Sequence, residues 1–449
     1  MFSLEEVIRI EKFERIKRFS DGKETPLLVM DLDTIEERFD ELARLMPGFK
    51  IYYAVKANPM DEIIQTLKDK GSSFDIATVY ELDQLLRLGV NPDRISFGST
   101  IKKAKDIKYA YDQGIKLFVT DSIPDIMDIA NNAPGSKVVL RFSTSNMNSE
   151  WPLGDKFGSH NERQEQILAM FSSLRTSQGK CGSDMVNIFS EIIDSKRVSL
   201  YGLSFHVGSQ KTTTMDWEYA IGKARDLFNR AEKLGIELKL LNIGGGFPAN
   251  YLRLSDDKKN LVFRKYDIRE FAATVMRALQ SEFGDRMPEL IVEPGRSLVG
   301  DAGVIVTEVI RRMNREETYQ PIPKKDLNTG GNRRIIPSMM YLEPALIRWV
   351  YIDIGVFGGL AETLGESIRY PIFGEGKADL IRTVIAGPTC DSMDTLYRNA
   401  PYYLRSDIKP GDRLFILTAG AYTQSYSSVG FNGIPPLKAF VLPRVHSNR

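Results

Sequence analysis

The chain has 449 residues, a formal net charge of +1 and an ordinary globular composition with 42% hydrophobic and 27% charged residues, and its length favours at least two domains. No apolar run approaches the roughly 20 residues that a membrane helix needs, which argues against a membrane partner. Positive charge is nowhere concentrated as it would be in a nucleic-acid-binding protein.

The N-terminal segment MFSLEEVIRIEKFERIKRF is charged throughout and lacks the apolar stretch of a signal peptide. Its spacing of apolar residues predicts an amphipathic helix. Only two cysteines, Cys181 and Cys390, are present, which is too few for a disulfide framework. This cysteine content suits a reducing cytosol, and we expect a cytoplasmic protein.

Between about residues 50 and 300, short β-branched runs alternate with longer segments whose apolar residues recur at helical spacing. Eight such units in about 250 residues predict a closed, TIM-type (β/α)8 barrel. The predicted barrel strands are 51–55, 73–77, 94–97, 116–119, 137–142, 199–206, 238–243 and 290–293. The predicted helices include 80–88, 103–112, 125–131, 217–234 and 269–283.

Beyond Gly300 the pattern changes to strands without regular helices between them, which predicts an all-β domain of β-sandwich or Greek-key-like type. Its predicted strands include 302–311, 349–352 and 413–417, and residues 26–29 are candidates to pair with them. The fold class is thus α/β plus all-β, with a barrel over 32–299 and a β domain from 1–31 and 300–449. Two irregular stretches, 177–185 and 312–341, are predicted to be surface excursions.

Catalytic groups of such barrels lie at the C-terminal ends of the strands, so the residues that follow each strand are informative. The predicted strand ends carry Lys56, residues 75–78, Arg141, residues 206–209, glycines 244–246 and residues 293–296. A lysine, a histidine, a glycine-rich turn and a glutamate on one rim indicate an anionic cofactor that forms an imine. The pattern predicts no metal site.

Lys56 follows small and aromatic apolar residues in YYAVKANP, so loss of solvent is expected to deprotonate its amine for Schiff-base formation. A solvent-facing lysine at a strand end is the alternative. The glycines 244–246 offer backbone N–H groups to a phosphate, and Arg296 and Ser209 would add a charge and a hydroxyl. A plain tight turn would use the same glycines.

Glu293 precedes Pro-Gly-Arg and is a candidate partner for a pyridinium nitrogen, although a local ion pair would also explain it. His206, one of three histidines, is placed for stacking on a cofactor ring, with a satisfied core histidine as the alternative. In GPTCDSMD, Cys390 can return a proton to a carbanion and Asp391 can hold a distal ammonium group. Ordinary turn chemistry would equally explain that segment.

The segments YYAVKANP, FDIAT, SFHVGSQ, GGGFP, EPGR, GPTCDSMD, GAYT and FNGIPP occur in this order between about Leu27 and Leu442. As an ordered set they resemble the fold-type III pyridoxal-phosphate decarboxylases, the family of ornithine, lysine and diaminopimelate decarboxylases. The resemblance is strongest to bacterial ornithine decarboxylase. It implies pyridoxal 5'-phosphate as cofactor and a small amino acid as substrate.

By that resemblance Lys56 is the Schiff-base lysine, His206 stacks on the cofactor ring and Glu293 binds the pyridine nitrogen. The other implied cofactor contacts are Ser209, Gly245, Gly246, Arg296 and Tyr422 around the phosphate, and Asp75 and Arg141 at the ring's other polar edge.

The resemblance also implies that Cys390 protonates the carbon that has lost CO₂ and that Asp391 contacts the substrate's distal amine. In the family these two residues come from the neighbouring subunit. It therefore implies a head-to-tail homodimer with shared active sites, in which Lys156 and Asp394 resemble an interface ion pair.

Within the family, GPTCDS favours a basic amino acid, because diaminopimelate enzymes have Cys-Glu-Ser there. The segments 351–355 (YIDIG) and 358–363 (GGLAET) resemble the bacterial ornithine or lysine branch, which implies a substrate contact for Asp353. Eukaryotic ornithine enzymes have an aspartate where this chain has Ile354, so one contact to the distal amine is missing here.

The leading hypothesis is decarboxylation of L-ornithine to putrescine in polyamine biosynthesis. Alternatives with the same chemistry are an N-substituted ornithine such as N-citrylornithine in siderophore biosynthesis, L-lysine and diaminopimelate. An alanine-racemase-like enzyme would share the barrel and cofactor without the Cys-Asp cluster. An inactive regulatory homologue would keep the fold and lose catalysis.

Overall fold

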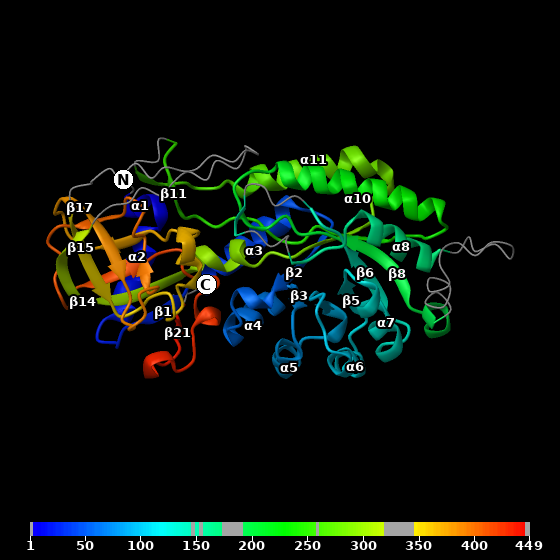
Figure 1. The fold of residues 1–449 in the computed structure, drawn as a ribbon, viewed down its shortest axis with the longest axis horizontal. Coiled ribbons are helices and arrows are strands. Elements are labelled where there is room, and N and C mark those ends of the chain that lie inside the picture. Colours follow the sequence, from blue (N-terminus) through cyan, green and yellow to red (C-terminus); the bar gives the residue numbers. More distant parts are fainter. Residues whose placement is uncertain are drawn as a thin grey trace, which may run out of the picture.

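The computed structural model describes residues 3–144, 149–151, 156–172, 192–256, 260–317 and 345–444. A β domain occupies one end of the elongated molecule and a closed barrel occupies the other (Figure 1). No helix in the described ranges is long and apolar enough to cross a membrane.

Eight parallel strands form the barrel in the order β2-β3-β4-β5-β6-β8-β10-β13, and pairing of β13 with β2 closes it. Their bounds are β2 Phe49–Ala54, β3 Ser73–Ile76, β4 Ile95–Phe97, β5 Leu117–Thr120, β6 Lys137–Arg141, β8 Ser199–Ser204, β10 Leu240–Asn242 and β13 Glu289–Val292. Each predicted barrel strand overlaps one of these, so the barrel prediction is confirmed. The first strand stops earlier than predicted, and Lys56 lies in the short turn η1 (Val55–Ala57) instead.

The barrel helices follow their strands and cover the outside of the sheet. Figure 1 shows α4 to α7 along one side of the molecule and α10 and α11 along the other. The bounds are α3 Leu32–Leu45, α4 Asp61–Asp69, α5 Val79–Arg87, α6 Ala104–Asp112, α7 Ile123–Asn132, α8 Asn161–Phe171, α10 Met215–Lys233, α11 Ile268–Phe283 and α12 Arg296–Val299, with the short 3₁₀ turns η2 Pro92–Arg94, η3 Gly284–Arg286 and η4 Gly300–Ala302. All five helices predicted in this region are present within one or two residues of their predicted ends.

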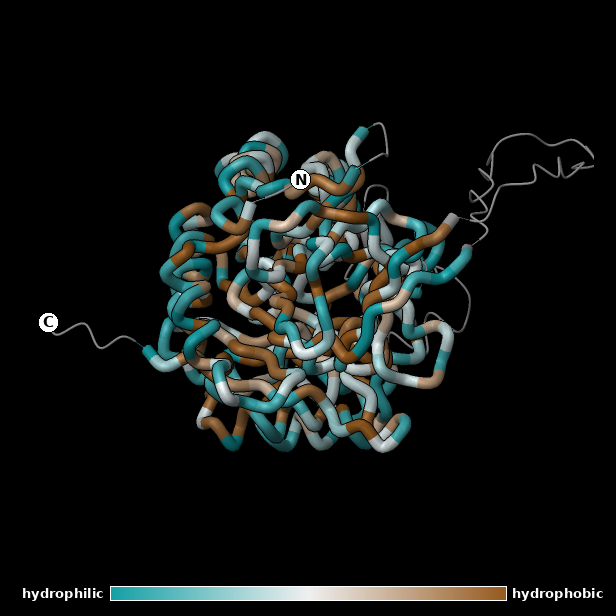
Figure 2. Tube along the Cα trace, turned by 90° about the vertical axis from the view of Figure 1, so that its left-hand side faces the viewer, coloured by the Kyte–Doolittle hydropathy of each residue, from teal (hydrophilic) through white to brown (hydrophobic). Residues whose placement is uncertain are grey.

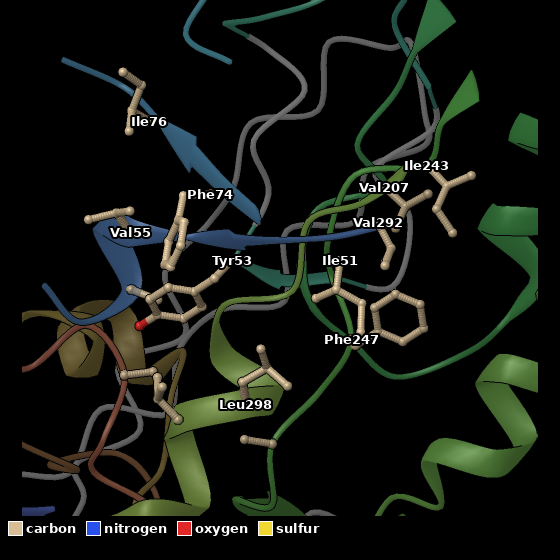
Figure 3. Close-up of a cluster of buried hydrophobic side chains, with 14 of the residues drawn as sticks. Ile51, Tyr53, Val55, Phe74, Ile76, Val207, Ile243, Phe247, Val292 and Leu298 are labelled. Carbon is tan, nitrogen blue, oxygen red and sulfur yellow. The ribbon is translucent and has the colours of Figure 1, made fainter. Parts of the chain in front are cut away.

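Strand residues of the barrel alternate between two environments, as the two-residue period of a strand requires. One set, which includes Tyr53, Phe74 and Val292, belongs to the main core between strands and helices (Figure 3). The other set, which includes Tyr52 and Ile291, fills the inside of the barrel. A polar residue two positions after an inside-facing residue therefore points into the barrel at its C-terminal rim.

The β domain is one nine-stranded sheet whose two halves share the long strand β14 (Gly303–Glu317). The first half of β14 pairs with β1 and β20, and its second half pairs with β15 after a register shift between Val309 and Arg311. The other strands are β1 Leu27–Met30, β15 Ala345–Ile352, β16 Ile372–Gly374, β17 Leu380–Ala386, β18 Thr395–Leu396, β19 Tyr403–Arg405, β20 Arg413–Ile416 and β21 Lys438–Val441, with the 3₁₀ turns η5 Ala361–Glu366, η6 Gln424–Tyr426 and η7 Phe431–Gly433. Hydrophobic residues lie inside this domain and hydrophilic ones around its edge (Figure 2).

The N-terminal segment completes the β domain. Residues 27–30 pair with both β14 and β21, which confirms the predicted pairing of this region. The predicted amphipathic helix is present but broken at Ile8, which has extended backbone, into α1 (Leu4–Val7) and α2 (Ile10–Ser20). Phe13 and Ile16 of α2 are buried against strands of the β domain.

Two parts of the chain differ from the sequence prediction. Residues 312–317, predicted as the start of a surface excursion, extend β14 instead, because their backbone pairs with 345–350 while the charged side chains of Arg312, Arg315 and Glu316 stay exposed. Two small antiparallel two-stranded sheets were not predicted, β7 (Ser149–Trp151) with β9 (Ser209–Lys211) and β11 (Leu252–Leu254) with β12 (Leu261–Phe263). The predicted stretch 177–185 and the rest of 312–341 lie outside the described residues.

Candidate active site

Strand alternation places several polar side chains on the inside of the barrel rim. Asp75 stands between Phe74 and Ile76, which face the main core, and Glu293 directly follows the outward-facing Val292. Lys56 reaches the same rim from the turn after β2, where its Nζ lies 3.7 Å from Asp75 Oδ2. Its side chain is 48% exposed in this single chain, so the amine borders an opening of the rim.

Asp75 is buried at the rim by a close fit with strand β4. The Ser96 hydroxyl donates to Asp75 Oδ1 at 3.0 Å. Gly98 makes room for the carboxylate, because a Cβ at that position would lie 1.9 Å from Oδ1. Any larger residue at position 98 would displace Asp75 from Lys56.

The electrostatics of this cluster differ from the prediction for Lys56. Burial works to lower the pKa of Lys56, but the nearby Asp75, with Tyr422 and Glu293, outweighs burial and raises that pKa above its usual value. Burial and the neighbouring Glu293 raise the pKa of Asp75 to about 8, against the opposing effect of Lys56. The expectation that desolvation deprotonates Lys56 is therefore wrong for the free chain, because the ion pair with Asp75 favours the charged amine.

Glu293 is oriented by Asn242, a residue that sequence reasoning did not single out. The side-chain Oδ1 of Asn242 accepts from the N–H of Gly244 at 2.9 Å, and this contact identifies the oxygen and the nitrogen of the side-chain amide. Its amide nitrogen donates to Glu293 Oε1 at 2.5 Å. One carboxylate oxygen is thereby held, and Oε2 is left to accept from a ligand.

His206 presents a neutral ring to the same rim. Its Nδ1 accepts from the N–H of Gly208 at 3.0 Å, so the ring proton is on Nε2. Burial, with the cations Arg141 and Lys56, lowers the pKa of His206 well below its usual value. An uncharged, fixed imidazole is suited to stacking on an aromatic ring.

The glycine-rich turn after β10 allows close approach of backbone to backbone. Gly244 and Gly246 have positive φ angles of 65° and 102°, which favour glycine. A Cβ at Gly245 would lie 2.4 Å from the Glu293 carbonyl oxygen and 3.5 Å from His206 Nε2. The turn, here called the cradle, is thus packed closely against the segments that carry the histidine and the glutamate, and its predicted role in phosphate binding stays a prediction.

Arg296 is buried beside this cradle and is fully engaged by the protein. Its guanidinium forms a bidentate ion pair with Glu362 at 2.6 and 2.7 Å and donates to Ser209 Oγ and to Tyr251 OH. The Tyr422 ring lies against the guanidinium, with 4.7 Å between the ring centroid and Cζ. Ser209, Arg296 and Tyr422 are therefore neighbours, as predicted, but the sequence did not point to Glu362.

Arg141 ends β6 on the same rim and carries the other predicted cation. Its guanidinium lies 5.3 Å from the Phe157 ring, and burial lowers its pKa. Among the described residues its guanidinium has no hydrogen-bond partner, so its donors are available to a ligand.

Cys390 and Asp391 lie on the β domain in the loop between β17 and β18, and among the described residues neither contacts the barrel rim of the same chain. Both are exposed, and the only thiol of the described residues is free. Asp394, four residues after Cys390, is buried and accepts from the backbone N–H groups of Val356 and Thr389 and from the Thr389 hydroxyl. Lys156 is exposed on the barrel, and its pairing with Asp394 of another subunit stays a prediction.

Asp353 and Ile354 also lie away from the rim. They line a cavity of about 150 Å³ within the β domain, together with Pro388 and Thr389 of the Cys390 loop. Asp353 Oδ1 accepts from the Thr307 hydroxyl at 2.5 Å and from the N–H of Glu308 at 3.1 Å. A substrate contact for Asp353 stays a prediction.

The rim residues fit the cofactor that the sequence implies. Lys56 supplies an amine, Glu293 a free carboxylate oxygen and His206 a neutral ring, and the glycines at 244–246 let the backbone of the turn pack against residues 206 and 293. Ser209, Gly246 and Tyr422 would hold a phosphate, and Arg141 and Asp75 would face the remaining polar edge. A dianionic phosphate suits a rim that carries the cations Lys56 and Arg141, with Arg296 paired to Glu362 beside it.

Comparison with known protein families supports this assignment. Residues 32–300 match the family model described as the pyridoxal binding domain of pyridoxal-dependent decarboxylases. The chain is 30% identical to the lysine/ornithine decarboxylase of Selenomonas ruminantium over 422 residues, which cover 94% of this chain and 90% of that protein. It is 28% identical to ornithine decarboxylase 2 of Drosophila melanogaster, over 92% of this chain and 91% of that protein.

Solved structures give the same result at the level of the fold. A lysine/ornithine decarboxylase from Vibrio vulnificus complexed with putrescine superposes with a TM-score of 0.74 at 26% identity, covering 97% of this chain and 99% of that one. A structure of SrLDC with PLP and cadaverine also superposes with a TM-score of 0.74 at 26% identity, covering 97% of this chain and 94% of that one. The barrel and the β domain therefore occur together in these neighbours, since almost the whole of each chain is aligned.

Proposed function

We propose that this chain, which belongs to the pyridoxal-dependent decarboxylase family and is therefore a pyridoxal-phosphate enzyme, converts L-ornithine to putrescine and CO₂ in polyamine biosynthesis. The observation that carries the proposal is the rim cluster, in which the Lys56 amine lies 3.7 Å from Asp75 beside an oriented Glu293 and a neutral His206. The relatives named above as lysine/ornithine and ornithine decarboxylases support a basic amino acid as the substrate.

When bound, the cofactor supplies an electron sink for the electron pair of the bond that breaks as CO₂ leaves. The protein's own residues prepare that site. Glu293 Oε2 would accept a hydrogen bond from the pyridine nitrogen, and Asn242 holds the carboxylate in the orientation that this contact needs. His206 would cover one ring face without adding charge, and Lys56 would supply the amine that holds the cofactor.

The carbon that loses CO₂ must then gain one proton. We assign that proton to the Cys390 thiol and the distal ammonium of the substrate to the Asp391 carboxylate. Because both lie on the β domain without contact to the rim of their own chain, they would serve the rim of a second copy. The enzyme is therefore proposed to be a homodimer with two shared active sites, and a cytoplasmic location stays a prediction.

The experiment incubates the purified protein and pyridoxal phosphate with L-ornithine, L-lysine, meso-diaminopimelate and N-citrylornithine separately, and identifies each product by mass spectrometry. Putrescine from free ornithine, absent with the Lys56→Ala variant, is the expected result. A D-amino acid instead of an amine would indicate racemase chemistry. Failure to form the imine absorbance band with pyridoxal phosphate would indicate an inactive homologue.

A second candidate is decarboxylation of an N-substituted ornithine such as N-citrylornithine in siderophore biosynthesis. The observation that favours it is Ile354, which is buried and lines the β-domain cavity in place of a carboxylate. An apolar residue there gives no partner to a free distal ammonium group. Turnover of the conjugate alone would establish this candidate, and turnover of lysine alone would establish a lysine decarboxylase.

A further inference from the structure

The Arg296–Glu362 ion pair is the least exposed charged group beside the cofactor site, with side-chain exposures of 3% and 1%. Arg296 begins α12 of the barrel, whereas Glu362 lies in η5 of the β domain. The pair therefore joins the two domains directly behind the phosphate cradle. Removing either partner would leave a buried charge without compensation, so the pair keeps its geometry.

The protein occupies every donor of the Arg296 guanidinium. Nη1 donates to Glu362 Oε2 at 2.7 Å and to Tyr251 OH at 3.1 Å. Nη2 donates to Glu362 Oε1 at 2.6 Å and to Ser209 Oγ at 3.1 Å, and Nε donates to Ser209 Oγ at 3.3 Å. An arginine has five N–H donors, so none is left for a phosphate oxygen while this arrangement holds.

The contacts of Arg296 determine which hydrogen bonds remain open to the Ser209 hydroxyl. A hydroxyl group has two acceptor lone pairs and one donor hydrogen. Two N–H groups of Arg296 point at Ser209 Oγ, so both lone pairs are used. The Ser209 hydroxyl hydrogen must therefore point away from Arg296, where it is available to a ligand.

We propose that Glu362 is a positioning residue of the phosphate site. Its two carboxylate oxygens fix the Arg296 guanidinium, and the guanidinium in turn orients the Ser209 hydroxyl so that it donates to the cofactor phosphate. Glu362 also neutralises Arg296 locally. Phosphate affinity then rests on aligned neutral donors, namely the Ser209 and Tyr422 hydroxyls and the backbone of the glycine turn, more than on a direct arginine contact.

The test compares binding of pyridoxal phosphate with binding of pyridoxal, which lacks the phosphate, to the full-length apoprotein by absorbance titration. For Glu362→Gln the dissociation constant of pyridoxal phosphate is expected to rise by about tenfold, the effect of losing roughly one net hydrogen bond to the phosphate. The dissociation constant of pyridoxal should not change. Equal weakening of both ligands, or no change in either, would overturn the proposal.

Two further comparisons test whether the effect is specific to Glu362 and whether it acts through Ser209. Glu366→Gln removes a carboxylate from the same turn that accepts only from the N–H of Asn399, and should leave both constants unchanged. If Glu362 acts through Ser209, adding Glu362→Gln to Ser209→Ala should weaken pyridoxal phosphate binding little further. Fully additive losses would show that Glu362 does not act through Ser209.

The conservative variant keeps the proposal testable if Glu362→Gln does not fold. Glu362→Asp retains the charge but is too short for the bidentate contact, so it should lower the preference for pyridoxal phosphate over pyridoxal. An unchanged preference would contradict the proposal. The inference rests on the phosphate site proposed above, and a wild-type protein without any preference for the phosphorylated ligand would disprove that site rather than the role of Glu362.

Discussion

The half-exposed Lys56 lies 3.7 Å from the buried Asp75, and Glu293 adds a second carboxylate to the same rim. The usual argument for a reactive lysine is desolvation, which lowers the lysine pKa. Here the carboxylates act in the opposite direction and prevail, so the free chain holds the amine as an ammonium ion. Binding of a cofactor at Lys56 therefore requires the amine to lose a proton. Asp75 is the neighbouring group that can accept this proton, because its pKa is raised.

The raised pKa of Asp75 has a consequence for stability. An unfolded Asp has a pKa of about 3.9, whereas burial and Glu293 raise the pKa of Asp75 in the folded chain to about 8. The folded state therefore binds more protons than the unfolded state between these values, and stability falls as pH rises through that window. Asp75→Asn removes this contribution, so the free energy of unfolding of the apoprotein should fall less with rising pH than in the wild type.

The measurement is urea unfolding of the apoprotein at several pH values within that window. Asp285→Asn, which removes an exposed carboxylate, serves as the control and should keep the wild-type slope. An Asp75→Asn protein with the wild-type pH dependence of stability would show that folding does not raise the pKa of Asp75.

At the scale of elements, the Cys390 loop is held by a single carboxylate. Asp394 receives hydrogen bonds from the Val356 N–H and from both the N–H and the hydroxyl of Thr389. Gly355 and Gly387 make room for it, because a Cβ at either position would lie within 2.4 Å of an Asp394 oxygen. The loop that presents Cys390 and the segment that presents Ile354 are thereby fastened together.

We expect Asp394→Ala to lower the free energy of unfolding by about 2–3 kcal/mol, since it leaves buried N–H donors without acceptors. The neighbouring Asp391→Asn is the matched control, because Asp391 is exposed and its carboxylate accepts only from the N–H of Met393. That variant should stay within about 0.5 kcal/mol of the wild type. Chemical denaturation of the three proteins tests the contrast, and equal stabilities would refute the role of Asp394.

Strand β14 is the element that joins the two halves of the β domain. Its buried first half packs against β1 and β20, and its exposed second half pairs with β15. Charged residues such as Arg312 and Glu316 hid the second half from a hydrophobicity-based prediction. Only backbone pairing with β15 reveals it as a strand, because a half-exposed strand has no continuous apolar run.

At the scale of the molecule, the barrel rim and the Cys390 loop of the β domain lie apart within one chain, although Tyr422 and Glu362 of the β domain do reach the rim. The barrel rim gathers Lys56, Asp75, His206 and Glu293, while Cys390 is exposed elsewhere on the β domain. A second copy of the chain, placed head to tail, would bring the two sets together at two equivalent sites.

This arrangement predicts complementation between inactive variants. Lys56→Ala and Cys390→Ala proteins should each have little activity, but a hybrid dimer contains one site with both residues intact. Random mixing of subunits should therefore restore up to about a quarter of the wild-type activity. The assay measures amine production after the subunits are dissociated and reassociated together. Mixtures that contain hybrid dimers by native mass spectrometry and yet stay inactive would exclude shared sites.

Local patterns in the sequence were sufficient to predict much of the fold and to identify most of the polar residues at the barrel rim. The eight barrel strands follow from short β-branched runs at regular spacing, and their C-terminal ends identify Lys56, Arg141, His206 and Glu293 because a closed parallel barrel brings all strand ends to one rim. The period of two residues in a strand also decides that Asp75 faces inward.

Only the tertiary structure decided how these residues act on one another. Glu362 meets Arg296 across 66 positions of sequence, and Asn242 meets Glu293 across 51, distances at which sequence spacing carries no contact information. The direction of the Lys56 pKa depends on the competition between burial and nearby carboxylates, which requires three-dimensional positions. The separation of Cys390 from the rim likewise depends on how the β domain is attached to the barrel, because long-range packing and not local propensity determines which strand ends face each other.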